Sequence, residues 1–506
     1  MCLSISQALT LLKEHNLVKE THILDKELYF KSIAYDSRKV VADTLFFCKG
    51  NFQQVYFQDA KKQGLSAYVS ETLYDDVTPA IIVTDVQKAM ALLSAAFYGY
   101  PQKELFIIGI TGTKGKTTTA YMTYEILKTA THGKTALFST IDRILGPKQQ
   151  FKSDLTTPES LDLFRDMRMA VDNHMTHLVM EVSSQAYKKN RVYGLRYDVG
   201  IFLNISPDHI GENEHPDFKD YLECKQQLLK NAQTCILNTQ SAYFDQLLAV
   251  AEHSTKKENI FLFGRQAQTP IQLDICFAGQ TENLKFSKIK IAALSEKAQQ
   301  LAIAGTYQSS IPGDYNESNA VAAILAARLA GATKADITTA LNQVKIAGRM
   351  EVIQSKKHGT ICVDYAHNYA SLKALLTFIK QQQPNTTITV VLSSAGNKGI
   401  SRRADLGRAL NEEAHQVILT TDDPGYEDPH QINQAIAKEI TNPRIKILEK
   451  LDRIEAIKFA LKNNDLNDVL VLAGKGEDPY QKIKGKDIFY AGDVNVVKTF
   501  LEEIEK

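Results

Sequence analysis

The chain has 506 residues, of which 44% are hydrophobic and 23% are charged, and its formal net charge is +1. This is an ordinary globular composition on a chain too long for one core, so we expect three domains, and the near-zero charge gives no electrostatic reason to expect binding to nucleic acid or to an anionic membrane. The six cysteines lack the CxxC spacing of a zinc site and fit no disulfide framework, which indicates a reducing compartment and a soluble, cytoplasmic protein.

Residues 1–101 have the pattern of a small α/β domain. The first residues, MCLSISQALTLLKEHN, form an amphipathic helical pattern that contains Lys and Glu, so they lack the apolar core of a signal peptide. No later stretch is long enough for an integral membrane segment. We expect strands at 28–30, 44–48 and 80–83 and helices at 55–63 and 86–97. Asp36-Ser37-Arg38 alone is typical of a turn, and Tyr98-Gly99-Tyr100-Pro101 ends the last helix and marks a linker.

The most informative stretch is 106–120, FIIGITGTKGKTTTA. An apolar, β-branched run suits a buried parallel strand, and the loop Gly112-Thr113-Lys114-Gly115-Lys116-Thr117 then leads through Thr118 into a helix. Strand, glycine loop and helix start form the geometry that binds phosphate. We expect Lys116 to reach the outer phosphates and the Thr117 hydroxyl to ligate Mg²⁺. The spacing departs from G-x-x-x-x-G-K-[ST] and Gly/Lys/Thr-rich turns are common, but a nucleoside triphosphate site is the better interpretation.

Two larger α/β blocks follow the linker. In 102–345 we expect strands at 135–138, 177–182, 199–204, 234–238 and 259–263 and helices at 118–129, 161–173, 218–230 and 316–329. In 346–506 we expect strands at 360–363, 388–392, 416–420 and 468–472 and helices at 371–381, 404–411, 429–440 and 453–462. Alternation of strand and helix predicts a doubly wound parallel sheet in each block, with ligands at the carboxyl ends of the strands. The expected fold is therefore α/β in three domains.

Polar clusters follow several strands of the middle block. Thr156-Thr157-Pro158-Glu159 is also an ordinary helix start, with Thr157 as the cap and Pro158 in the first position. Glu181 and Ser183 follow an apolar strand, where a carboxylate facing the phosphate loop suits Mg²⁺, although a solvated carboxylate is as common there.

A second group of polar residues follows the strand that ends near residue 203. Asn204, Asp208 and His209 come directly after this strand, and Lys225 lies inside the next amphipathic helix. Taken alone, a histidine after a strand is more often structural, and a lysine on a helix is more often a solvated charge.

Eleven motifs in order connect this sequence to a known family. They are GTKGKTTT, TTPES, MEVSSQAY, FLNISPDHI, YLECK, GDYNESNA, GRMEVI, VDYAHN, GNKGISRR, DDPGYEDP and GKGEDPYQ. The sequence resembles the Mur ligase family, and specifically its MurE type, over essentially its whole length, including DSRKV near the N-terminus. Each motif alone is weak, but their common order and spacing make coincidence negligible.

The resemblance implies an ATP-dependent amide ligase of peptidoglycan precursor synthesis that uses ATP and Mg²⁺. The expected partner is UDP-N-acetylmuramoyl-L-alanyl-D-glutamate, whose carboxylate is converted to an acyl phosphate and then attacked by an amine. The implied domains are a UDP-binding domain at 1–101, an ATP-binding domain at 102–345 and an amino-acid-binding domain at 346–506. We expect a cytoplasmic monomer that binds no nucleic acid.

The resemblance also implies roles for individual residues. The family's UDP-sugar-binding positions are occupied here by Ser37, Arg38, Thr156, Thr157, Ser183 and Arg191. Its ATP-binding positions are occupied by Gly112, Thr113, Lys114, Gly115, Lys116, Thr117 and Thr118 and by Asn316, Arg349 and Asp364. The catalytic set is Lys116, His209 and Lys225, and the metal set is Thr117, Glu181, His209 and Lys225, the last as a carbamylated lysine. Two positions depart from the family pattern: Tyr369 replaces a frequent Pro, and Gln185 replaces a frequent His.

The incoming amino acid is matched by Asp422, Asp423, Glu477 and Asp478. Relatives that add meso-diaminopimelate resemble one another in a D-N-P-R stretch whose Arg binds the distal carboxylate. Here Gly425 occupies the position of that Arg and Asp423 adds a negative charge, which favours an ammonium-bearing substrate. We therefore predict L-lysine, with L-ornithine as runner-up, although DDPG could be only a turn. The alternatives are meso-diaminopimelate as substrate, a folylpolyglutamate synthetase-like ligase, and a nucleotide-sugar-binding paralogue that has lost catalysis.

Overall fold

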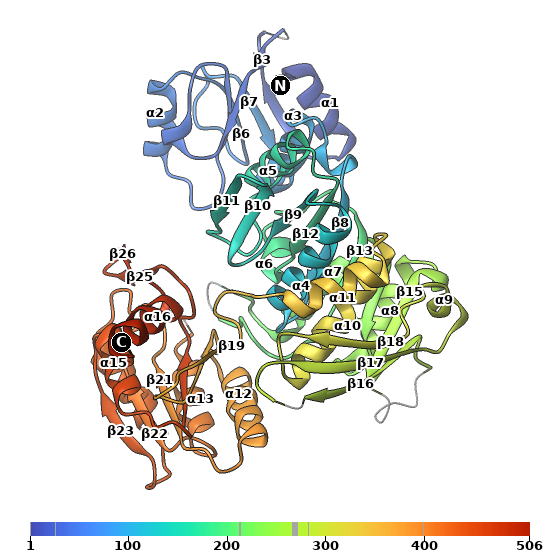
Figure 1. Cartoon of the computed structure of the whole chain (residues 1–506). Coiled ribbons are helices and arrows are strands. Elements are labelled where there is room, and N and C mark those ends of the chain that lie inside the picture. Colours follow the sequence, from blue (N-terminus) through green and yellow to red (C-terminus); the bar gives the residue numbers. More distant parts are fainter. Residues whose placement is uncertain are drawn as a thin grey trace. The chain divides into compact units, whose positions relative to one another are not determined.

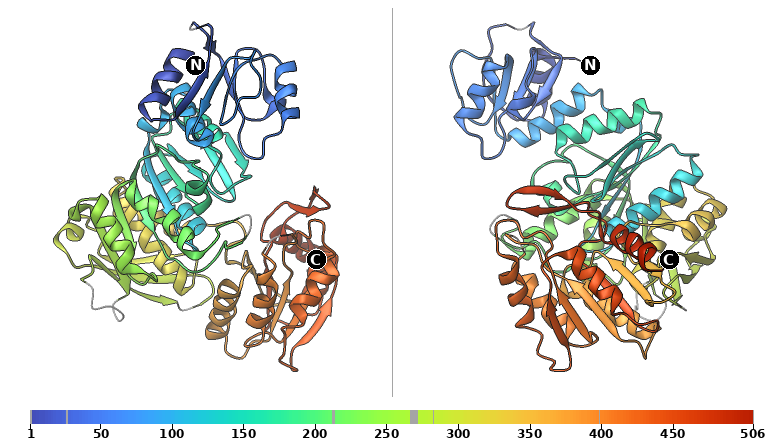
Figure 2. Two further views of the ribbon diagram at one scale, coloured as in Figure 1. Left: turned by 180° about the vertical axis from the view of Figure 1, so that it is seen from behind. Right: turned by 60° about the vertical axis from the view of Figure 1, so that its left-hand side comes forward.

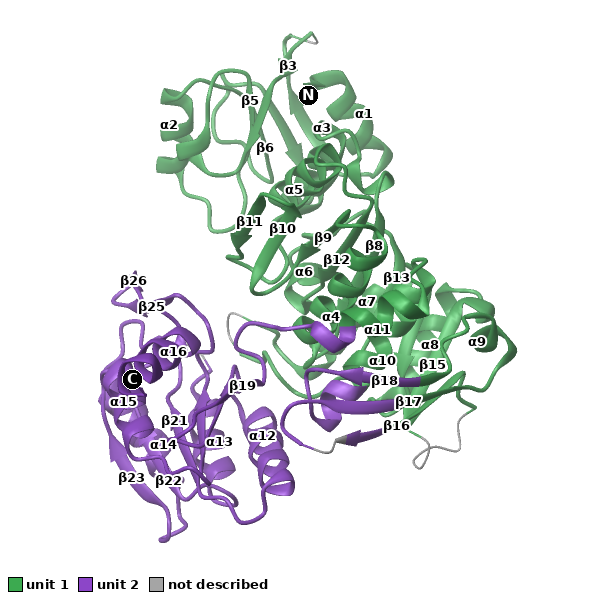
Figure 3. Ribbon diagram, in the orientation of Figure 1, with its two compact units in different colours: residues 1–278, 290–305, 318–340 green, residues 279–289, 306–317, 341–506 purple. Residues whose placement is uncertain are grey.

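The computed structural model describes residues 2–25, 27–211, 214–265, 272–281, 283–397 and 399–505, so Lys398 of the GNKGISRR motif lies outside the described residues. The chain divides into two compact units (Figure 3). Unit 1 comprises residues 1–278, 290–305 and 318–340, and unit 2 comprises residues 279–289, 306–317 and 341–506. The boundaries of the three expected domains stay a prediction. No helix among the described residues is long and apolar enough to cross a membrane.

The N-terminal part of unit 1 contains seven short strands. They are β1 (Leu3–Ser4), β2 (Val18–His22), β3 (Tyr29–Phe30), β4 (Ser32–Ala34), β5 (Thr44–Phe47), β6 (Leu65–Ser70) and β7 (Ala80–Val83). Five of them form a sheet in the order β2-β7-β6-β5-β4, parallel from β4 to β7, with β2 antiparallel at the edge. β1 and β3 form a separate antiparallel pair.

Helices α1 (Ile5–Glu14), α2 (Gln54–Lys62) and α3 (Val86–Phe97) accompany this sheet, with a 3₁₀ turn at Ser37–Lys39. A capping box starts α1: the Gln7 N–H donates to Ser4 Oγ at 3.1 Å and the Ser4 N–H donates to Gln7 Oε1 at 2.9 Å. α3 is buried along most of its length because it packs against α1, β6 and the later helix α5 (Ser160–Asp172).

The large sheet has eleven strands in the order β11-β10-β9-β12-β8-β13-β14-β15-β16-β17-β18 (Figure 1). In unit 1 these are β8 (Phe106–Thr111), β9 (Thr135–Phe138), β10 (Asp142–Gly146), β11 (Gln149–Lys152), β12 (His177–Glu181), β13 (Tyr197–Phe202), β14 (Ala232–Asn238) and β15 (Ile260–Arg265). The division between the units passes through β16 (Ile275–Thr281), β17 (Ser287–Ala293) and β18 (Gly305–Ser309). The strands are parallel from β9 to β16, and β10 and β11 add an antiparallel edge.

The strand order reverses at β8. The chain moves from β8 in one direction to β9 and later in the other direction from β12 to β13, so the carboxyl ends of β8, β12 and β13 border the crevice where ligands bind in doubly wound sheets. The connecting helices are α4 (Lys116–Ala130), α5, α6 (Ser184–Lys188), α7 (Phe218–Lys230) and α8 (Phe244–Ser254). Three further helices follow: α9 (Glu296–Gln300), α10 (Asp314–Leu329) and α11 (Lys334–Gln343).

Unit 2 contains a six-stranded sheet in the order β19-β20-β24-β21-β22-β23, parallel except for β19. Its strands are β19 (Glu351–Gln354), β20 (Thr360–Asp364), β21 (Ile388–Leu392), β22 (Gln416–Leu419), β23 (Lys446–Glu449) and β24 (Val469–Ala473), and β25 (Tyr480–Ile483) with β26 (Lys486–Phe489) forms a separate hairpin. Right-handed crossovers place α12 (Tyr369–Gln382), α13 (Ser401–Leu410) and α14 (Pro429–Ala437) on one face and α15 (Arg453–Lys462) on the other, where α16 (Asp493–Ile504) joins it (Figure 2).

The structure confirms the predicted α/β class with parallel doubly wound sheets. The predicted bounds of α3, α7 and α15 agree with the structure. α13 begins three residues before its predicted start and α14 ends three residues before its predicted end. Among the described residues, the strand predictions omitted β1, β2, β4 and β6 in the N-terminal part, β10, β11 and β16 to β18 in the large sheet, and β19, β23, β25 and β26 in unit 2.

Candidate functional site

The phosphate loop joins the carboxyl end of β8 to the first turn of α4, as the sequence predicts. Gly115 precedes α4 with φ at +84°, and a Cβ at this position would lie 2.3 Å from Oδ1 of Asn319. Both the backbone conformation and the available space therefore require glycine here. The loop leads into a helix of four turns, whose N-terminal N–H groups and positive dipole end are the groups that bind phosphate in other proteins.

Two lysines donate to the same carbonyl of this loop. Lys116 Nζ donates to the carbonyl oxygen of Gly112 at 2.9 Å and to that of Thr113 at 3.3 Å, and Lys225 Nζ donates to Gly112 at 2.8 Å. The Lys225 side chain is 2% exposed, and burial first, then the charge of Lys116, lower its pKa well below the usual range. The low pKa favours the neutral amine, which is the form that reacts with carbon dioxide to give a carbamate.

The loop after β13 is fastened to the phosphate loop. The side-chain amide of Asn204 accepts from the Lys114 N–H at 2.9 Å and donates to the Lys114 carbonyl at 3.0 Å. Thr113 Oγ1 lies 3.0 Å from the Tyr221 hydroxyl of α7. No role was predicted for Tyr221, because a contact between residues 108 positions apart leaves no local pattern in the sequence.

Glu181 is the buried carboxylate at the end of β12. It accepts hydrogen bonds from the Thr117 hydroxyl at 3.2 Å, the Thr140 N–H at 2.7 Å and the Thr140 hydroxyl at 3.1 Å. Glu181 therefore faces the first turn of α4, where the sequence analysis places the metal. Thr140 is a further residue of this site, and no motif pointed to it.

His209 lies on the loop between β13 and α7 with φ at +57° and its side chain 43% exposed. Its Nδ1 lies 2.7 Å from Glu214 Oε1, and the neighbouring Asp208 accepts from Lys114 Nζ at 3.1 Å. Of the four predicted metal residues, Thr117 and Glu181 are in contact; the contacts found among the described residues do not join His209 or Lys225 to that pair.

Four of the six predicted UDP-sugar residues form one group. Thr157 Oγ1 donates to the Glu181 carbonyl at 3.0 Å and accepts from the Ser183 N–H at 3.1 Å. Arg191 Nη1 donates to the Thr157 carbonyl at 3.3 Å, and the hydroxyl of Thr156 lies 3.0 Å from that of Thr140.

Glu159 links this group to the N-terminal part of unit 1. Its carboxylate accepts from Arg191 Nε at 2.9 Å and from Lys49 Nζ at 2.8 Å, so two partly buried cations meet at one acid. Lys49 had no role in the sequence analysis. Ser37 and Arg38 lie on their own 3₁₀ turn, where Arg38 forms a bidentate pair with Asp36.

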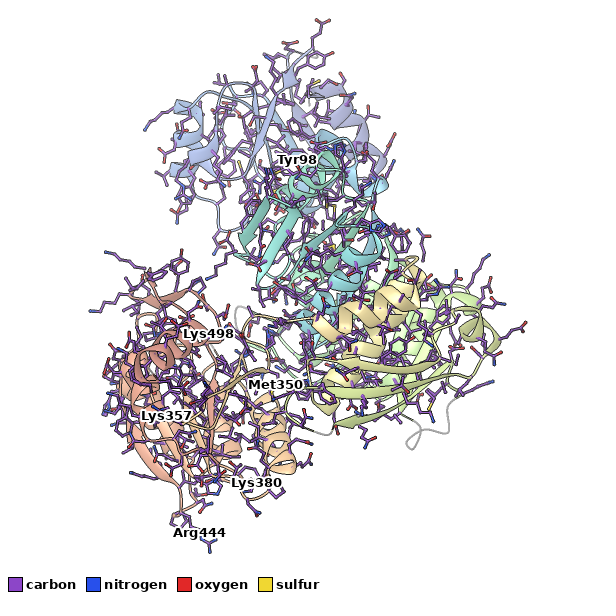
Figure 4. The ribbon with its side chains drawn as sticks, viewed as in Figure 1. Tyr98, Met350, Lys357, Lys380, Arg444 and Lys498 are labelled. Atoms are coloured by element: carbon purple, nitrogen blue, oxygen red, sulfur yellow. The ribbon has the colours of Figure 1, made fainter. Side chains whose placement is uncertain are left out.

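The remaining predicted ATP residues lie in unit 2. The Asp364 carboxylate accepts a hydrogen bond at 2.8 Å from the backbone N–H of Met350, the residue labelled in Figure 4. Burial raises the pKa of the Asp364 carboxyl and the charge of Arg349 opposes that rise. The guanidinium carbon of Arg349 lies 4.8 Å from the Tyr365 ring centre. Asn316 is 2% exposed and donates to the Pro312 carbonyl at 2.8 Å.

Lys475 joins the predicted amino-acid residues in unit 2. Its buried ammonium lies 2.6 Å from Asp423 Oδ1, 3.1 Å from Asp478 Oδ2 and 3.8 Å from Asp422 Oδ1. Burial lowers the pKa of Lys475, but the three carboxylates outweigh it and leave the pKa above its ordinary value. Burial raises the pKa of Asp422, and Lys475 opposes that rise. No role was predicted for Lys475, although it lies inside the GKGEDPYQ motif.

Strand β25 holds the DDPG turn in place. The Gly425 N–H donates to the Lys482 carbonyl at 2.9 Å, and the Lys482 N–H donates to Asp423 Oδ1 at 3.0 Å. The Gln481 amide donates to the carbonyl oxygens of Thr421 at 3.1 Å and Asp422 at 3.3 Å. The turn therefore has a fixed position in unit 2.

Glu477, the fourth predicted amino-acid residue, follows Lys475 by two positions. Burial first, and then the nearby charge of Glu351, raise the pKa of its carboxyl, while Lys498 opposes the rise.

Two family models match most of the chain. The Mur ligase middle domain matches residues 110–327, and the Mur ligase glutamate ligase domain matches residues 348–476. The chain is 58% identical over 511 residues to the UDP-N-acetylmuramyl-tripeptide synthetase of Ligilactobacillus salivarius, with 100% of both proteins covered. It is 48% identical over 478 residues to the UDP-N-acetylmuramoyl-L-alanyl-D-glutamate--L-lysine ligase of Enterococcus faecalis, covering 93% of this chain and 92% of that protein.

Solved structures share the fold at low sequence identity. A UDP-N-acetylmuramoyl-L-alanyl-D-glutamate--2,6-diaminopimelate ligase aligns with TM-score 0.68 and 24% identity over 100% of both chains. A folylpolyglutamate synthase of Mycobacterium tuberculosis aligns with TM-score 0.59 and 17% identity over 76% of this chain and 92% of that chain. These two alignments are informative about fold alone.

Proposed function

The chain belongs to the Mur ligase family, and we propose that it uses ATP to join L-lysine to the D-glutamate carboxylate of UDP-N-acetylmuramoyl-L-alanyl-D-glutamate. This reaction is a step of peptidoglycan precursor synthesis, and the enzyme is an ATP-dependent acid–amino-acid ligase. One observation carries the proposal: the chain aligns over its full length with tripeptide synthetases, and over nearly its full length with a lysine ligase.

The chemistry requires activation of a carboxylate, which is a poor electrophile. A carboxylate oxygen attacks the γ-phosphorus of ATP, ADP leaves, and an acyl phosphate forms. The amine of lysine then attacks the acyl carbon, the tetrahedral intermediate collapses, and phosphate leaves as the amide bond forms. The phosphate loop and Lys116 are proposed to position the phosphates and to neutralise the charge that develops on the transferred group.

The residues around Glu181 suit Mg²⁺. The Glu181 carboxylate and the Thr117 hydroxyl are in contact, and both offer the oxygen ligands that this ion prefers. We assign the metal to Thr117, Glu181, His209 and carbamylated Lys225, because a carbamate replaces a cation by an anion at the last position. When bound, Mg²⁺ supplies positive charge beside the phosphoryl oxygens.

The UDP-linked substrate is assigned to the group formed by Thr156, Thr157, Ser183 and Arg191, with Ser37 and Arg38 at the uracil end. Arg191 keeps its guanidinium close to Thr157 through two hydrogen bonds, one to the Thr157 carbonyl and one to Glu159. A fixed guanidinium beside hydroxyl groups is suited to an anionic, polar ligand.

The amino-acid site is assigned to Asp422, Asp423, Glu477 and Asp478. Three of these carboxylates share the single ammonium of Lys475, which leaves an excess of negative charge. Such a site favours a substrate with a side-chain ammonium, whereas the distal carboxylate of meso-diaminopimelate would meet no guanidinium at Gly425. Asp423 makes the shortest of the three contacts with Lys475 and also accepts from the Lys482 N–H, so we assign to it two roles, holding the turn and adding negative charge to the site.

A competition assay tests the substrate assignment. The protein is incubated with ATP, Mg²⁺, UDP-N-acetylmuramoyl-L-alanyl-D-glutamate and equal concentrations of L-lysine, L-ornithine and meso-diaminopimelate, and the products are separated by mass. We expect the lysine product to dominate, with some ornithine product, because one methylene changes the rate by only about 10–200-fold. Equal rates with meso-diaminopimelate and L-lysine would overturn the assignment.

The other properties of the proposed enzyme follow from its substrates. A nucleotide-linked substrate and ATP are cytoplasmic metabolites, so we assign the protein to the cytoplasm. We propose that it works as a monomer; light scattering after size exclusion tests this by comparing the solution mass with 56.5 kDa.

A further inference from the structure

A Ser-His-Asp chain of hydrogen bonds lies beside the predicted site in unit 1. His215 Nδ1 lies 2.6 Å from Asp220 Oδ2, and His215 Nε2 lies 2.8 Å from Ser184 Oγ. A carboxylate only accepts hydrogen bonds, so Nδ1 carries the proton and the Ser184 hydroxyl donates to Nε2. The His215 side chain is fully buried and Ser184 is 3% exposed.

The hydrogen-bonded side chains of Ser184, His215 and Asp220 provide neither a catalytic nucleophile nor a metal site. In serine hydrolases the same order of groups activates the serine for attack on a substrate, but a substrate cannot reach the buried Ser184 hydroxyl. Cys224 brings a third possible metal ligand close to His215 and Asp220. However, both nitrogens of His215 already have partners, and Lys188 Nζ lies 2.8 Å from Asp220 Oδ2, where its charge repels a cation.

Ser184 and Asp220, the two residues that His215 joins, lie on different helices. Ser184 is the first residue of α6 and directly follows Ser183, whose N–H donates to the Thr157 hydroxyl in the proposed UDP-sugar group. Asp220 lies in the first turn of α7, the helix that carries Lys225. Among the described residues, His215 is thus the only one whose side chain accepts a hydrogen bond from Ser184 and donates one to Asp220.

His215 also holds the intervening loop and the phosphate loop. Its backbone N–H donates to the His209 carbonyl at 2.9 Å. Its ring meets the Tyr221 ring edge-on, with centres 5.2 Å apart, and the Tyr221 hydroxyl contacts Thr113.

We propose that His215 is a positioning residue that fixes α6, α7 and the His209 loop against one another. Through Ser184 it sets the affinity for the UDP-linked substrate, and through Asp220 it sets the affinity for the divalent cation. This inference rests on the proposed function, because it uses the assigned roles of the two helices.

Two substitutions of His215 distinguish the effect of its hydrogen bond to Ser184 from that of its hydrogen bond to Asp220. In His215→Gln the longer side chain can reach Ser184 but not Asp220, and in His215→Asn the shorter amide can donate to Asp220 but not reach Ser184. We expect His215→Gln to weaken Mn²⁺ binding about tenfold and to change UDP-substrate binding less than threefold; we expect the reverse for His215→Asn. Calorimetry measures the dissociation constant of the UDP-linked substrate, and electron paramagnetic resonance measures that of Mn²⁺ in the presence of a non-hydrolysable ATP analogue.

Milder variants keep the proposal testable if the His215 variants do not fold. Ser184→Ala should reproduce the His215→Asn pattern, and Asp220→Asn should reproduce the His215→Gln pattern. His177→Gln, a half-buried histidine at the start of β12, is the control, and we expect both of its constants to stay within twofold of wild type. Variants that lose only stability, or change both constants together, contradict the inference. A wild-type protein that forms no product instead contradicts the proposed function.

Discussion

At the scale of single residues, the most unusual feature is the convergence of Lys116 and Lys225 on the Gly112 carbonyl. Like charges in a buried place repel one another strongly, and the lowered pKa of Lys225 favours its neutral amine, which relieves this repulsion. Bound ATP would offer phosphate oxygens as better partners for the Lys116 ammonium than two loop carbonyls. We therefore expect Lys116 to give up its hydrogen bonds to the loop carbonyls and to bind phosphate oxygens when ATP is present.

We expect Lys116→Ala to lower kcat by at least about 10²–10³-fold, the range found when one group that stabilises transition-state charge is removed. The fold should persist, because the lost hydrogen bonds are to two carbonyls of the phosphate loop, which lie outside β8 and α4. Phosphate release and circular dichroism measure the two effects. Lys128→Ala, on the exposed side of the same helix, is the matched control. Near-normal phosphate release by a folded Lys116 variant would rule out the assignment.

We expect Lys225→Ala to be almost inactive and to regain activity when short-chain carboxylic acids are added. The substitution leaves a buried space beside the phosphate loop, and a small carboxylate can restore the missing anionic ligand. Activity is measured with and without acetate or propionate, and Lys230→Ala at the end of α7 serves as the control. The carbamate role is wrong if no acid rescues the variant and removal of bicarbonate leaves the wild type unaffected.

The sequence pointed to some of these residues and not to others for a physical reason. Lys116 lies in a motif whose local spacing carries the chemistry. The contact of Tyr221 with Thr113, and that of Lys49 with Glu159, join residues more than one hundred positions apart and depend on tertiary packing. Thr140 donates to Glu181 only because β9 and β12 are neighbours in the sheet.

At the scale of elements, the three helices whose predicted bounds agree with the structure share one feature, an aspartate that caps the N-terminus. The helices α3, α7 and α15 begin after Asp85, Asp217 and Asp452, and each of these side chains accepts from a backbone N–H of the first turn. α13 lacks such a cap, and its start was predicted three residues too late. The strands β25 and β26 are short and mostly exposed, so no alternation of apolar residues reveals them; their mutual pairing makes them strands.

The DDPG turn constrains any attempt to change the substrate. Gly425 has φ at +59°, and a Cβ there would lie 2.3 Å from Oδ1 of Asn397, which accepts from the Tyr426 N–H. A side chain at this position therefore meets both backbone strain, about 1–3 kcal/mol, and the loss of that hydrogen bond.

We predict that Gly425→Arg alone is destabilised, and that Gly425→Arg with Asn397→Ala recovers part of the stability and gains use of meso-diaminopimelate. Gly425→Ala and Gly133→Ala form a matched pair, since Gly133 also has a positive φ but has open space around it. Thermal unfolding should show the larger loss for Gly425→Ala. Equal losses of thermal stability in the two variants would show that the Asn397 side chain moves aside without a cost in stability.

Lys475 is expected to govern the pH dependence of unit 2. Its folded pKa is raised above the ordinary value of 10.5, so its stabilisation is present below that value and is lost as the pH rises through the folded pKa. Lys475→Met leaves Asp422, Asp423 and Asp478 without their ammonium, which should cost about 3–5 kcal/mol at neutral pH.

The loss of stability in Lys475→Met should become smaller as the pH falls, because the pKa of the buried Asp422 rises further without Lys475 and its carboxyl takes up a proton. Urea unfolding at several pH values measures this, with Lys482→Met on the exposed side of β25 as control. A deficit that is independent of pH would indicate lost packing rather than unpaired charge.

At the scale of the whole molecule, alternating strands and helices predicted the class of fold, but not how far the large sheet extends. The strand β17 alternates buried and exposed residues, and this pattern was readable in SKIKIAA. By contrast β6 follows a helix after only two residues, and its sequence does not separate it from that helix. The order of strands could not be read from the sequence either, because it depends on the crossovers between neighbours.

Turnover of the proposed enzyme should require all three substrates together. We expect phosphate release only when ATP, UDP-N-acetylmuramoyl-L-alanyl-D-glutamate and L-lysine are all present, with one ADP, one phosphate and one amide product per cycle. Without the UDP-linked substrate the D-glutamate carboxylate that accepts the phosphoryl group is absent. We expect the protein to close around its ligands and to exclude water from the acyl phosphate, so that at most one equivalent of ADP forms when lysine is omitted.

A coupled ADP assay and a phosphate assay, run with each substrate omitted in turn, measure this stoichiometry. The Lys116→Ala variant gives the background of each assay. A protein that binds all three ligands but releases no phosphate would be the nucleotide-sugar-binding paralogue that has lost catalysis. Steady phosphate release without lysine would instead show that water reaches the acyl phosphate, and the enzyme would then act partly as an ATPase.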